Sequence, residues 1–306
     1  MSVRVLEGAS NAPATDPANP FLTADYGLAQ EALGAGVLWF SAGAVTTLGL
    51  VHRGRITKRL ELPSMPASAP AEFWSDLLDH CRTERIGLVD LDSFGSDGRG
   101  VPKLEGETKR WARTELVLDL DAGMLARASG THRQRIRQGA KAGLRLDLAR
   151  SDEALGIHLG LIQASMTRRA ERGEAVHLTF DREPFRALLA TGSGVLCRAI
   201  RADDQAVLAS MLVLRSPGAG YDHSSGVAPE GRQCGAQHFL IHETAKLLAA
   251  EGAVALNLGG VRETEQSLRE FKERFGTRPV DTESIRCDIR TTFNRLMART
   301  AARLKR

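Results

Sequence analysis

The stretch LNLGGVRETEQSLREFKERFG, Leu256–Gly276, decides how the rest of the sequence is interpreted. An apolar alternating run, a Gly-Gly break and a charged segment ending at glycine predict a strand, a turn and a helix. At 100° per residue, Leu268, Phe271 and Phe275 fall within about 60° and form the predicted buried face of that helix. Lys272 lies only about 40° from Leu268. Either its aliphatic stem covers apolar surface while its charge reaches water, or the amine has a function.

The composition is that of an ordinary globular protein. The chain has 306 residues, of which 42% are hydrophobic and 25% charged, enough for one large domain or two of about 150 residues. The longest apolar candidate, residues 194–214, is interrupted by four charged residues, so no transmembrane segment is predicted. The first 17 residues lack the apolar region of a secretory signal, and a cytoplasmic location is predicted. The net charge of +4 is low for a DNA-binding domain but compatible with a phosphate-bearing partner.

The order of predicted elements is similar in the two halves. Residues 1–20 are rich in Ala, Asn and Pro and are predicted to form a flexible arm. Residues 21–130 predict helix, two strands, helix and strand. Residues 151–306 predict two helices, a hairpin turning at Asp203-Asp204, strand, helix, strand, the helix of the opening stretch and a final strand. The sequence therefore predicts two mixed α/β units joined by a connector at residues 131–150.

The connector HRQRIRQGAKAGLRL carries a basic pattern. Arg133, Arg137, Lys141 and Arg145 recur at every fourth residue and predict one basic stripe on a helix. A solvated face is one explanation and a phosphate-binding surface is the other. Because like charges at this spacing repel one another, the pattern favours a polyanionic partner.

Several of these segments resemble a known family. A strand ending in Leu258-Gly259-Gly260, followed by an FKxxFG helix end at residues 271–276, resembles the C-terminal half of the GNAT acyltransferase fold in Fem-like proteins. The connector resembles the basic helix between the two GNAT units of that family. NPFLTADYGLAQ and LPSMP resemble parts of its first unit. The resemblance begins at about residue 19 and implies two GNAT-like units in tandem.

The resemblance implies acyl transfer to an amine, forming an amide. Well-known members take amino acids from aminoacyl-tRNA to build peptidoglycan cross-bridges, while others make natural-product amides or use acyl-CoA. The family lysine at the acyl-transfer centre corresponds to Lys272, and Phe271, Gly259 and Gly260 are its implied substrate-binding neighbours. This sequence lacks the long helical-hairpin insertion of several members, which leaves tRNA use and a cell-wall acceptor open.

The turn for an acyl-CoA site is imperfect. Such a site has a Q/R-x-x-G-x-G/A turn before a long helix, where backbone N–H groups bind the pyrophosphate. Arg232 and Gly235 fit this pattern, but Gln237 stands at the last position. A bulky side chain there weighs against a standard CoA site, and a plain helix-capping loop is the alternative.

Further candidates surround these motifs. The segment YDHSSG places Tyr221 and His223 on one face of a predicted strand and Asp222 on the other. The resemblance implies that this strand splays near the acyl-transfer centre, so Tyr221 and His223 are candidate catalytic residues. His223 could take a proton from the attacking amine, with a structural histidine as the alternative. Arg168 and Arg169 are candidate substrate ligands at the end of a predicted helix, or part of a solvated helix end.

No metal site and no bound cofactor are predicted. His238 and His242 are spaced i, i+4, but Phe239 stands where an HExxH site needs glutamate. The four cysteines contain no CxxC pair, which argues against zinc and disulfides. Cys234 is not assigned as a nucleophile, because the GNAT fold usually transfers its acyl group directly.

The combined prediction is a cytoplasmic N-acyltransferase that uses aminoacyl-tRNA, favoured by the basic connector and the imperfect CoA turn. The alternatives are an acyl-CoA-dependent GNAT N-acyltransferase and a non-catalytic GNAT-like protein that binds tRNA or a partner. The basic segment at residues 291–306 could contact RNA, an anionic membrane surface or a partner, or pack on its own domain. The acyl group, the amine acceptor, the pathway and the oligomeric state are not predicted.

Overall fold

The computed structural model describes residues 3–66, 68–96, 100–173, 176, 179–262 and 264–291. The chain divides into two compact units, each built around mixed β-strand pairing, which confirms the predicted α/β class. The described residues of unit 1 lie within Met1–Asp16, Phe21–Thr114 and Val280–Arg306. Those of unit 2 lie within Pro17–Pro20 and Glu115–Pro279.

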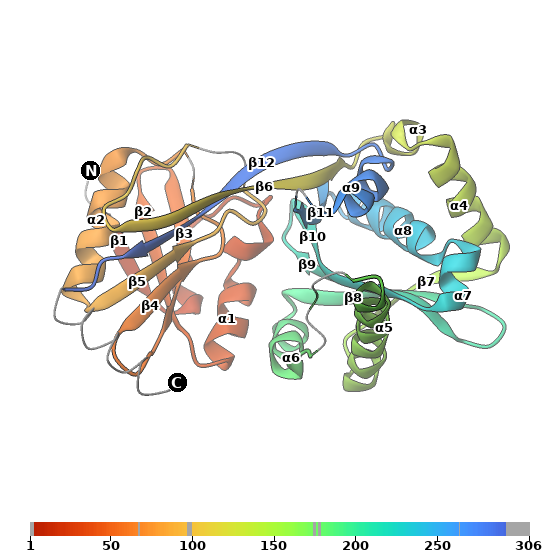
Figure 1. The fold of residues 1–306 in the computed structure, drawn as a ribbon, viewed down its shortest axis with the longest axis horizontal. Coiled ribbons are helices and arrows are strands. Elements are labelled where there is room, and N and C mark those ends of the chain that lie inside the picture. The colour runs from red at the N-terminus through yellow and green to blue at the C-terminus, as the bar shows by residue number, and fades with distance from the viewer. Residues whose placement is uncertain are drawn as a thin grey trace. The chain divides into compact units, whose positions relative to one another are not determined.

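The first part of the chain supplies most of unit 1 (Figure 1). Its elements are β1 (Arg4–Glu7), η1 (Ala9–Asn11), η2 (Pro20–Leu22), α1 (Ala24–Ala32), β2 (Gly36–Ala42), β3 (Val45–His52), β4 (Lys58–Leu62), α2 (Ala71–Thr83), β5 (Ile86–Leu91) and β6 (Glu107–Asp119). Strands β1 to β4 pair antiparallel, and β4 and β5 pair parallel. The helix α2 makes the crossover that a parallel pair requires.

Unit 2 repeats this plan. Its elements are α3 (Met124–Arg127), α4 (Gly130–Lys141), β7 (Leu144–Ala149), α5 (Asp152–Glu171), α6 (Arg182–Thr191), β8 (Gly194–Arg201), β9 (Val207–Arg215), β10 (Ala219–Val227), α7 (Pro229–Cys234), α8 (Ala236–Ala250), β11 (Ala255–Val261) and α9 (Gln266–Glu273), before β12 (Arg278–Asp288). Strands β7 to β10 pair antiparallel, and β10 and β11 pair parallel.

Each unit is completed by a strand from a distant part of the chain. The strand order is β1-β2-β3-β4-β5-β12-β6 in unit 1 and β6-β11-β10-β9-β8-β7 in unit 2. Strand β12 pairs with β5 through Ile285↔Leu91, so residues 280–291 belong to unit 1, whereas residues 115–130 and the connector 131–150 belong to unit 2. The predicted boundaries at 21–130, 131–150 and 151–306 were wrong here, because long-range strand pairing leaves no local signal.

The predicted flexible arm at residues 1–20 also needs correction. Strand β1 pairs with β2, with Val5 opposite Phe40. Ala9 is fully buried, and its N–H donates to the Glu31 carboxylate at 2.8 Å. A segment rich in alanine and proline is therefore ordered by edge pairing and burial.

Local sequence signals set several helix ends in unit 2. Ser151 accepts a hydrogen bond from the N–H of Ala154 at the start of α5, and Ser129 caps α4 through the N–H of His132. Helix α4 ends at Lys141, before Gly143 in the left-handed region.

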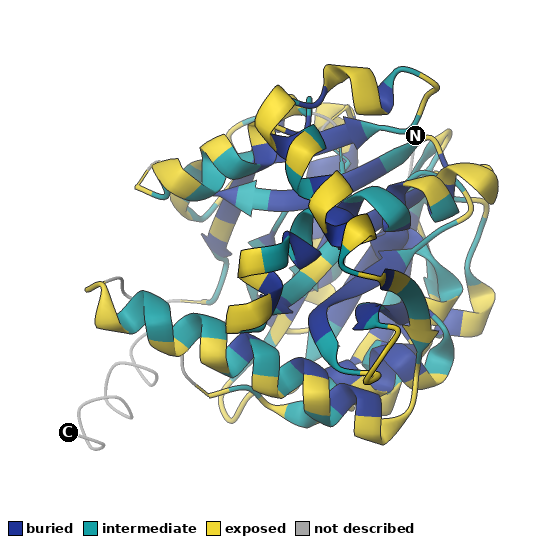
Figure 2. Ribbon diagram, turned by 90° about the vertical axis from the view of Figure 1, so that its right-hand side faces the viewer, coloured by how far each residue is buried: buried dark blue, intermediate teal, exposed yellow. Residues whose placement is uncertain are grey.

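Helices cover both faces of the unit 2 sheet. Helices α4 and α8 lie on one face and α5 and α6 on the other (Figure 1). The α8 face holds the apolar core, with Phe239, Leu240 and Leu248 against the strands. Figure 2 shows buried residues along the strands and exposed residues on the helices and loops.

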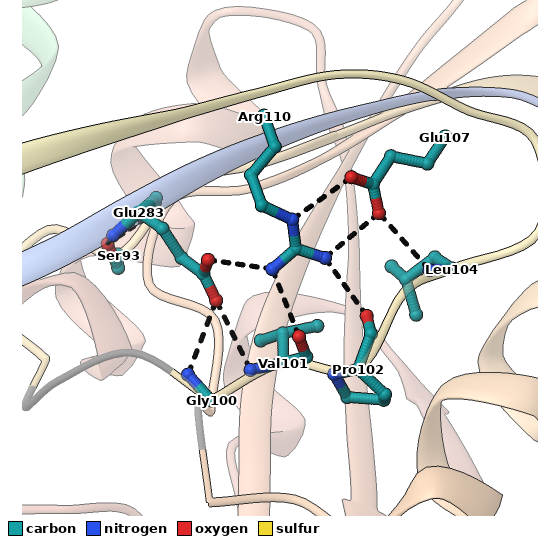
Figure 3. A network of polar contacts seen from close by, with 8 residues as sticks. All are labelled: Ser93, Gly100, Val101, Pro102, Leu104, Glu107, Arg110 and Glu283. Atoms are coloured by element: carbon teal, nitrogen blue, oxygen red, sulfur yellow. Dashed lines mark hydrogen bonds and ion pairs between the residues drawn. The ribbon is translucent and has the colours of Figure 1, made fainter.

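A partly buried ion-pair network holds the segment before β6 in unit 1 (Figure 3). The Arg110 guanidinium donates to the carboxylates of Glu283 at 2.7 Å and Glu107 at 2.9 Å. Glu283 also accepts from the N–H groups of Gly100 and Val101. These charges are satisfied within the protein, so the network is structural.

Candidate active site

The parallel strands of unit 2 separate near their carboxyl ends. Pairing of β10 with β11 extends from Ala219↔Ala255 only to Tyr221↔Asn257. The β9–β10 register then shifts between Asp222 and Ser224, so His223 is the extra residue of a β-bulge. The predicted splay is present, and carboxyl ends of parallel strands are a common place for ligand sites.

Lys272 is buried beside this splay. Its relative exposure is 9%, and it is the buried residue of α9. Its Nζ donates to the carbonyl oxygens of Gly259 at 3.2 Å and Gly260 at 3.3 Å. Because the ammonium group bonds to protein carbonyls, the explanation that it reaches water from an apolar surface was wrong.

The backbone conformation at Gly259 favours glycine. Its φ of 78° lies in the left-handed region. A Cβ atom there would lie 3.3 Å from the Asp222 carbonyl oxygen, 3.7 Å from Lys272 Nζ and 3.8 Å from the Tyr221 hydroxyl. A backbone carbonyl, the Lys272 ammonium group and the Tyr221 hydroxyl thus converge on one point beside Gly259.

A buried polar network supports the point of convergence. The carboxylate of Glu115, on β6, accepts from the Tyr221 hydroxyl at 2.8 Å and from Asn257 Nδ2 at 2.6 Å. Asn257 Oδ1 in turn accepts from the N–H of Gly259 at 2.8 Å. Tyr221 therefore lies near Lys272, but its hydroxyl is committed to Glu115.

A pocket of about 960 Å³ lies within unit 2 at the ends of α5, β10 and β11 and at the start of α8. Its walls include Phe271, the neighbour of Lys272, together with Leu268 and Ser225. Six arginines also line it, namely Arg135, Arg168, Arg169, Arg172, Arg232 and Arg262, with Glu265 as the acidic residue. The site suits an anion with several charges.

The arginines are held in different ways. Arg169 pairs with Glu265 at 2.7 Å, and Arg168 donates to the Ser165 hydroxyl at 3.1 Å. Burial lowers the pKa of Arg168, and the positive charges of Arg232 and Arg172 lower it further. Like charges gathered at one wall store repulsion that a bound anion would relieve.

The predicted Arg232–Gln237 turn lies on this pocket. Gly235 has a φ of 79°, and a Cβ there would lie 2.4 Å from the Arg135 carbonyl oxygen. The Arg135 guanidinium donates to the carbonyls of Arg232 and Gln233. Gly235 therefore allows α4 to pack closely, while Gln237 reaches the pocket wall.

The predicted basic stripe is only partly present. Arg145 lies on β7 and donates to Gln205, because α4 ends before it. Arg133 donates to the backbone carbonyls of Ala126 and Ala128. Arg137 and Lys141 are exposed on α4. The four residues do not form one helical stripe, and Arg135 is the α4 residue that lines the pocket.

The histidines fall into separate environments. His223 is exposed, and its ring packs edge-on against Phe185 of α6 at 5.7 Å. His158 is fully buried, with ring nitrogens 2.9 Å from the Ser210 hydroxyl and 3.0 Å from the Ser224 hydroxyl. His238 lines the pocket and packs edge-on against Phe271 at 5.2 Å, and burial lowers its pKa to about 4.

The described part of the chain contains neither a candidate metal cluster nor a helix that could span a membrane. Within it, no cluster of three His, Cys, Asp or Glu side chains could hold a metal ion. None of its helices is long and apolar enough to cross a membrane. The basic segment predicted at residues 291–306 lies outside the described residues beyond Thr291.

Comparison with known proteins assigns the region that carries the site. Its sequence matches the family model of the acetyltransferase (GNAT) domain. The match covers residues 126–273. This matched region lies inside unit 2 and contains Lys272, the arginine-lined pocket and the splay, so the general prediction of a GNAT acyltransferase is supported. No curated protein matches the chain by sequence.

Solved structures similar to the whole chain include FemX, with a TM-score of 0.65 and 12% identity, covering 90% of this chain and 93% of FemX. The "C-terminal Domain (DUF2156) of Putative Lysylphosphatidylglycerol Synthetase" from Agrobacterium fabrum has a TM-score of 0.53 and 14% identity, covering 91% and 90%. A tandem GNAT protein from the clavulanic acid biosynthesis pathway has a TM-score of 0.52 and 12% identity, covering 95% and 100%. At these identities the likeness shows the fold, and the predicted resemblance to Fem-like, double-GNAT proteins is confirmed at that level.

Sequence reasoning missed several residues of the site. Asn257 is a polar residue inside an apolar strand, and Glu115 precedes the apolar run LVL. Either could have been noted as a buried polar group, but not paired with the other. Arg135, Arg172 and Arg262 gave no local signal that set them apart from surface arginines.

Proposed function

We propose that this protein is an N-acyltransferase that transfers an aminoacyl group from aminoacyl-tRNA to an amine, forming an amide. The observation that carries the proposal is a pocket lined by six arginines whose wall residue Phe271 directly precedes the buried Lys272. The pocket would bind the donor, and the lysine would act where the acyl group is transferred.

The pocket supports a donor rich in phosphate. Guanidinium groups bind phosphate in two-point geometry and keep their charge at all relevant pH values. Six of them with one nearby carboxylate exceed what a single phosphate neutralises. The exposed Arg137 and Lys141 would add a weaker, outer contact to nucleic acid. Aminoacyl-tRNA as donor would place the reaction in the cytoplasm.

Lys272 supports the transfer step. When an amine attacks the acyl carbonyl, negative charge develops on the carbonyl oxygen, and a fixed ammonium group can stabilise it. The two carbonyl bonds from Lys272 hold its Nζ in place. Gly259 and Gly260 provide those carbonyls, and Phe271 would bound the space for the acyl group.

The turn before α8 favours a second candidate, an acyl-CoA-dependent N-acyltransferase. Arg232 and Gly235 lie on the pocket next to the N-terminus of a 15-residue helix, where a pyrophosphate could bind. Gln237 at the pocket wall argues against this donor, because its side chain occupies space near the helix start.

The test is consumption of the donor. The full chain is incubated with a mixture of aminoacyl-tRNAs and, separately, with acyl-CoAs, with hydroxylamine as a small acceptor, and hydroxamate formation is measured. We expect hydroxamate from aminoacyl-tRNA and much less from the Lys272→Met variant. Product from acyl-CoA alone would establish the second candidate. No product from either donor would favour a non-catalytic, tRNA- or partner-binding protein.

A further inference from the structure

Asp222 occupies a distinctive position in the GNAT domain. It is the last residue of β10 in register before the bulge, opposite Val213. Gly220, two residues earlier, faces Leu248 of α8, so Asp222 points to the same face. His223 is the bulged residue and contacts Phe185 of α6 on the other face. The side chains of Asp222 and His223 therefore lie on opposite faces of the sheet, the first toward α8 and the second toward α6.

The Asp222 carboxylate is incompletely satisfied. Its Oδ1 atom is buried and has no hydrogen-bond partner among the described residues. Ser225 is its hydrogen-bonding neighbour, and Ser225 lines the arginine pocket. A buried carboxylate oxygen without a partner is costly. It leaves one hydrogen-bond acceptor position unfilled beside the splay.

Charged and titratable groups from neighbouring elements also face Asp222. Lys272 interacts with it electrostatically from α9, and Cys197 does so from β8. Burial raises the pKa of Cys197 to about 11, so this thiol is neutral. The Asp222 carbonyl oxygen and Lys272 Nζ both lie within 4 Å of the Cβ position at Gly259. The backbone of Asp222 and the Lys272 ammonium group thus lie on either side of the same point.

We propose that Asp222 is the proton acceptor of the transfer reaction, and this inference rests on the proposed function. The acceptor amine donates a hydrogen bond to Oδ1, and its nitrogen forms the C–N bond to the acyl carbon. Asp222 takes the N–H proton while the carbonyl electrons move onto the oxygen that faces Lys272. When these electrons return, the bond from carbon to the donor oxygen breaks, and Asp222 gives the proton to that oxygen.

The protonation behaviour of Asp222 agrees with this role. Burial raises its pKa to about 7, a rise limited by Lys272 and then by Ser225. A base whose pKa lies near the working pH is deprotonated in a large fraction of molecules and still binds a proton strongly.

The test compares Asp222→Asn with His223→Gln in the full chain, using whichever donor the wild type consumes and a primary amine, ethanolamine, as acceptor. We expect Asp222→Asn to lower kcat/KM by roughly 100-fold or more and to abolish the rise in rate with pH near 7. His223→Gln should retain that rise. Hydrogen exchange would verify that both variants are folded.

The possible outcomes separate the two levels of the proposal. If the wild type consumes neither donor, the proposed function fails, and this inference fails with it. If the wild type transfers the acyl group and folded Asp222→Asn keeps the same rate and pH profile, only this inference is overturned. Loss of the pH-dependent rise in His223→Gln, but not in Asp222→Asn, would assign the proton to His223.

Discussion

The two units use corresponding strand pairs to opposite effect. In unit 1 the parallel pair β4–β5 stays together to its end and beyond, through Leu62↔Leu91, the hydrogen bond from the N–H of Met65 to Asp92 and the bridge Ser64↔Ser93. In unit 2 the pair β10–β11 stops at Tyr221↔Asn257, and β10 bulges. The same strand arrangement therefore gives continuous pairing in unit 1 and separated strand ends, with room for a site, in unit 2.

The charges of the two units differ in the same way. In unit 1 the carboxylates of Glu283 and Glu107 neutralise Arg110, and backbone N–H groups complete the network (Figure 3). In unit 2 six arginines share a pocket with one acidic wall residue. Compensated charge stabilises a fold, whereas accumulated like charge destabilises it and attracts a ligand of opposite sign. The comparison predicts function in unit 2 and stability in unit 1.

The largest effect is expected at Lys272. Lys272→Met keeps the stem and removes the charge, so kcat should fall by roughly two to three powers of ten, the usual result of losing one oxyanion donor. Lys272→Arg should recover little activity, because a planar guanidinium cannot replace a fixed ammonium group. Steady-state kinetics and circular dichroism measure the result. Full activity in a folded Lys272→Met variant would show that Lys272 takes no part in the reaction, and the functional contrast between the two units would lose its main support.

The next largest effect concerns the pocket. The double variant Arg168→Ala/Arg232→Ala should weaken donor binding by about tenfold or more per arginine, since hydrogen bonds to charged groups contribute about 1.5–3 kcal/mol. The slope of log affinity against log salt should fall by about one unit per lost phosphate contact. The matched control is Arg137→Ala/Lys141→Ala on the exposed face of α4. If the control loses more affinity than the pocket variant, the donor site lies on α4.

A stability effect is expected in unit 1. Glu283→Gln keeps the shape but removes the charge that binds Arg110. We expect the free energy of unfolding to fall by about 1.5–3 kcal/mol, measured by urea denaturation, with kcat per folded molecule unchanged. A loss of kcat without loss of stability would show that unit 1 takes part in the reaction.

The smallest effect is a pH-dependent change at Asp222. Its folded pKa of about 7 is raised, so between about pH 4 and pH 7 the folded state keeps a proton that the unfolded state has released. Stability therefore falls as the pH rises through this window. Asp222→Asn should raise Tm at pH 8, by about 2–4 °C for each 1 kcal/mol recovered, and change it less at pH 4. The exposed Asp204, whose pKa Arg201 lowers, should show no such gain when replaced by Asn.

The sequence by itself determined the elements with strong local signals. The hairpin of β8 and β9, the strands β10 and β11, and the helices α5, α6 and α8 follow from periodicity, caps and turns. The same periodicity singled out Lys272, because a charged residue beside an apolar face conflicts with its local pattern.

Only the tertiary structure decided how these elements combine. Three features depend on contacts between residues far apart in the sequence. They are the positions of β12 and β6 in the strand order, the hydrogen bond between Asn257 and Glu115, and the burial of Lys272. The same holds for the pocket, where α4, α5, α7 and the loop before α9 each contribute arginines. An arginine on a helix surface has the same local pattern whether it faces water or a pocket. Its role is therefore fixed by long-range packing, which local periodicity and capping do not encode.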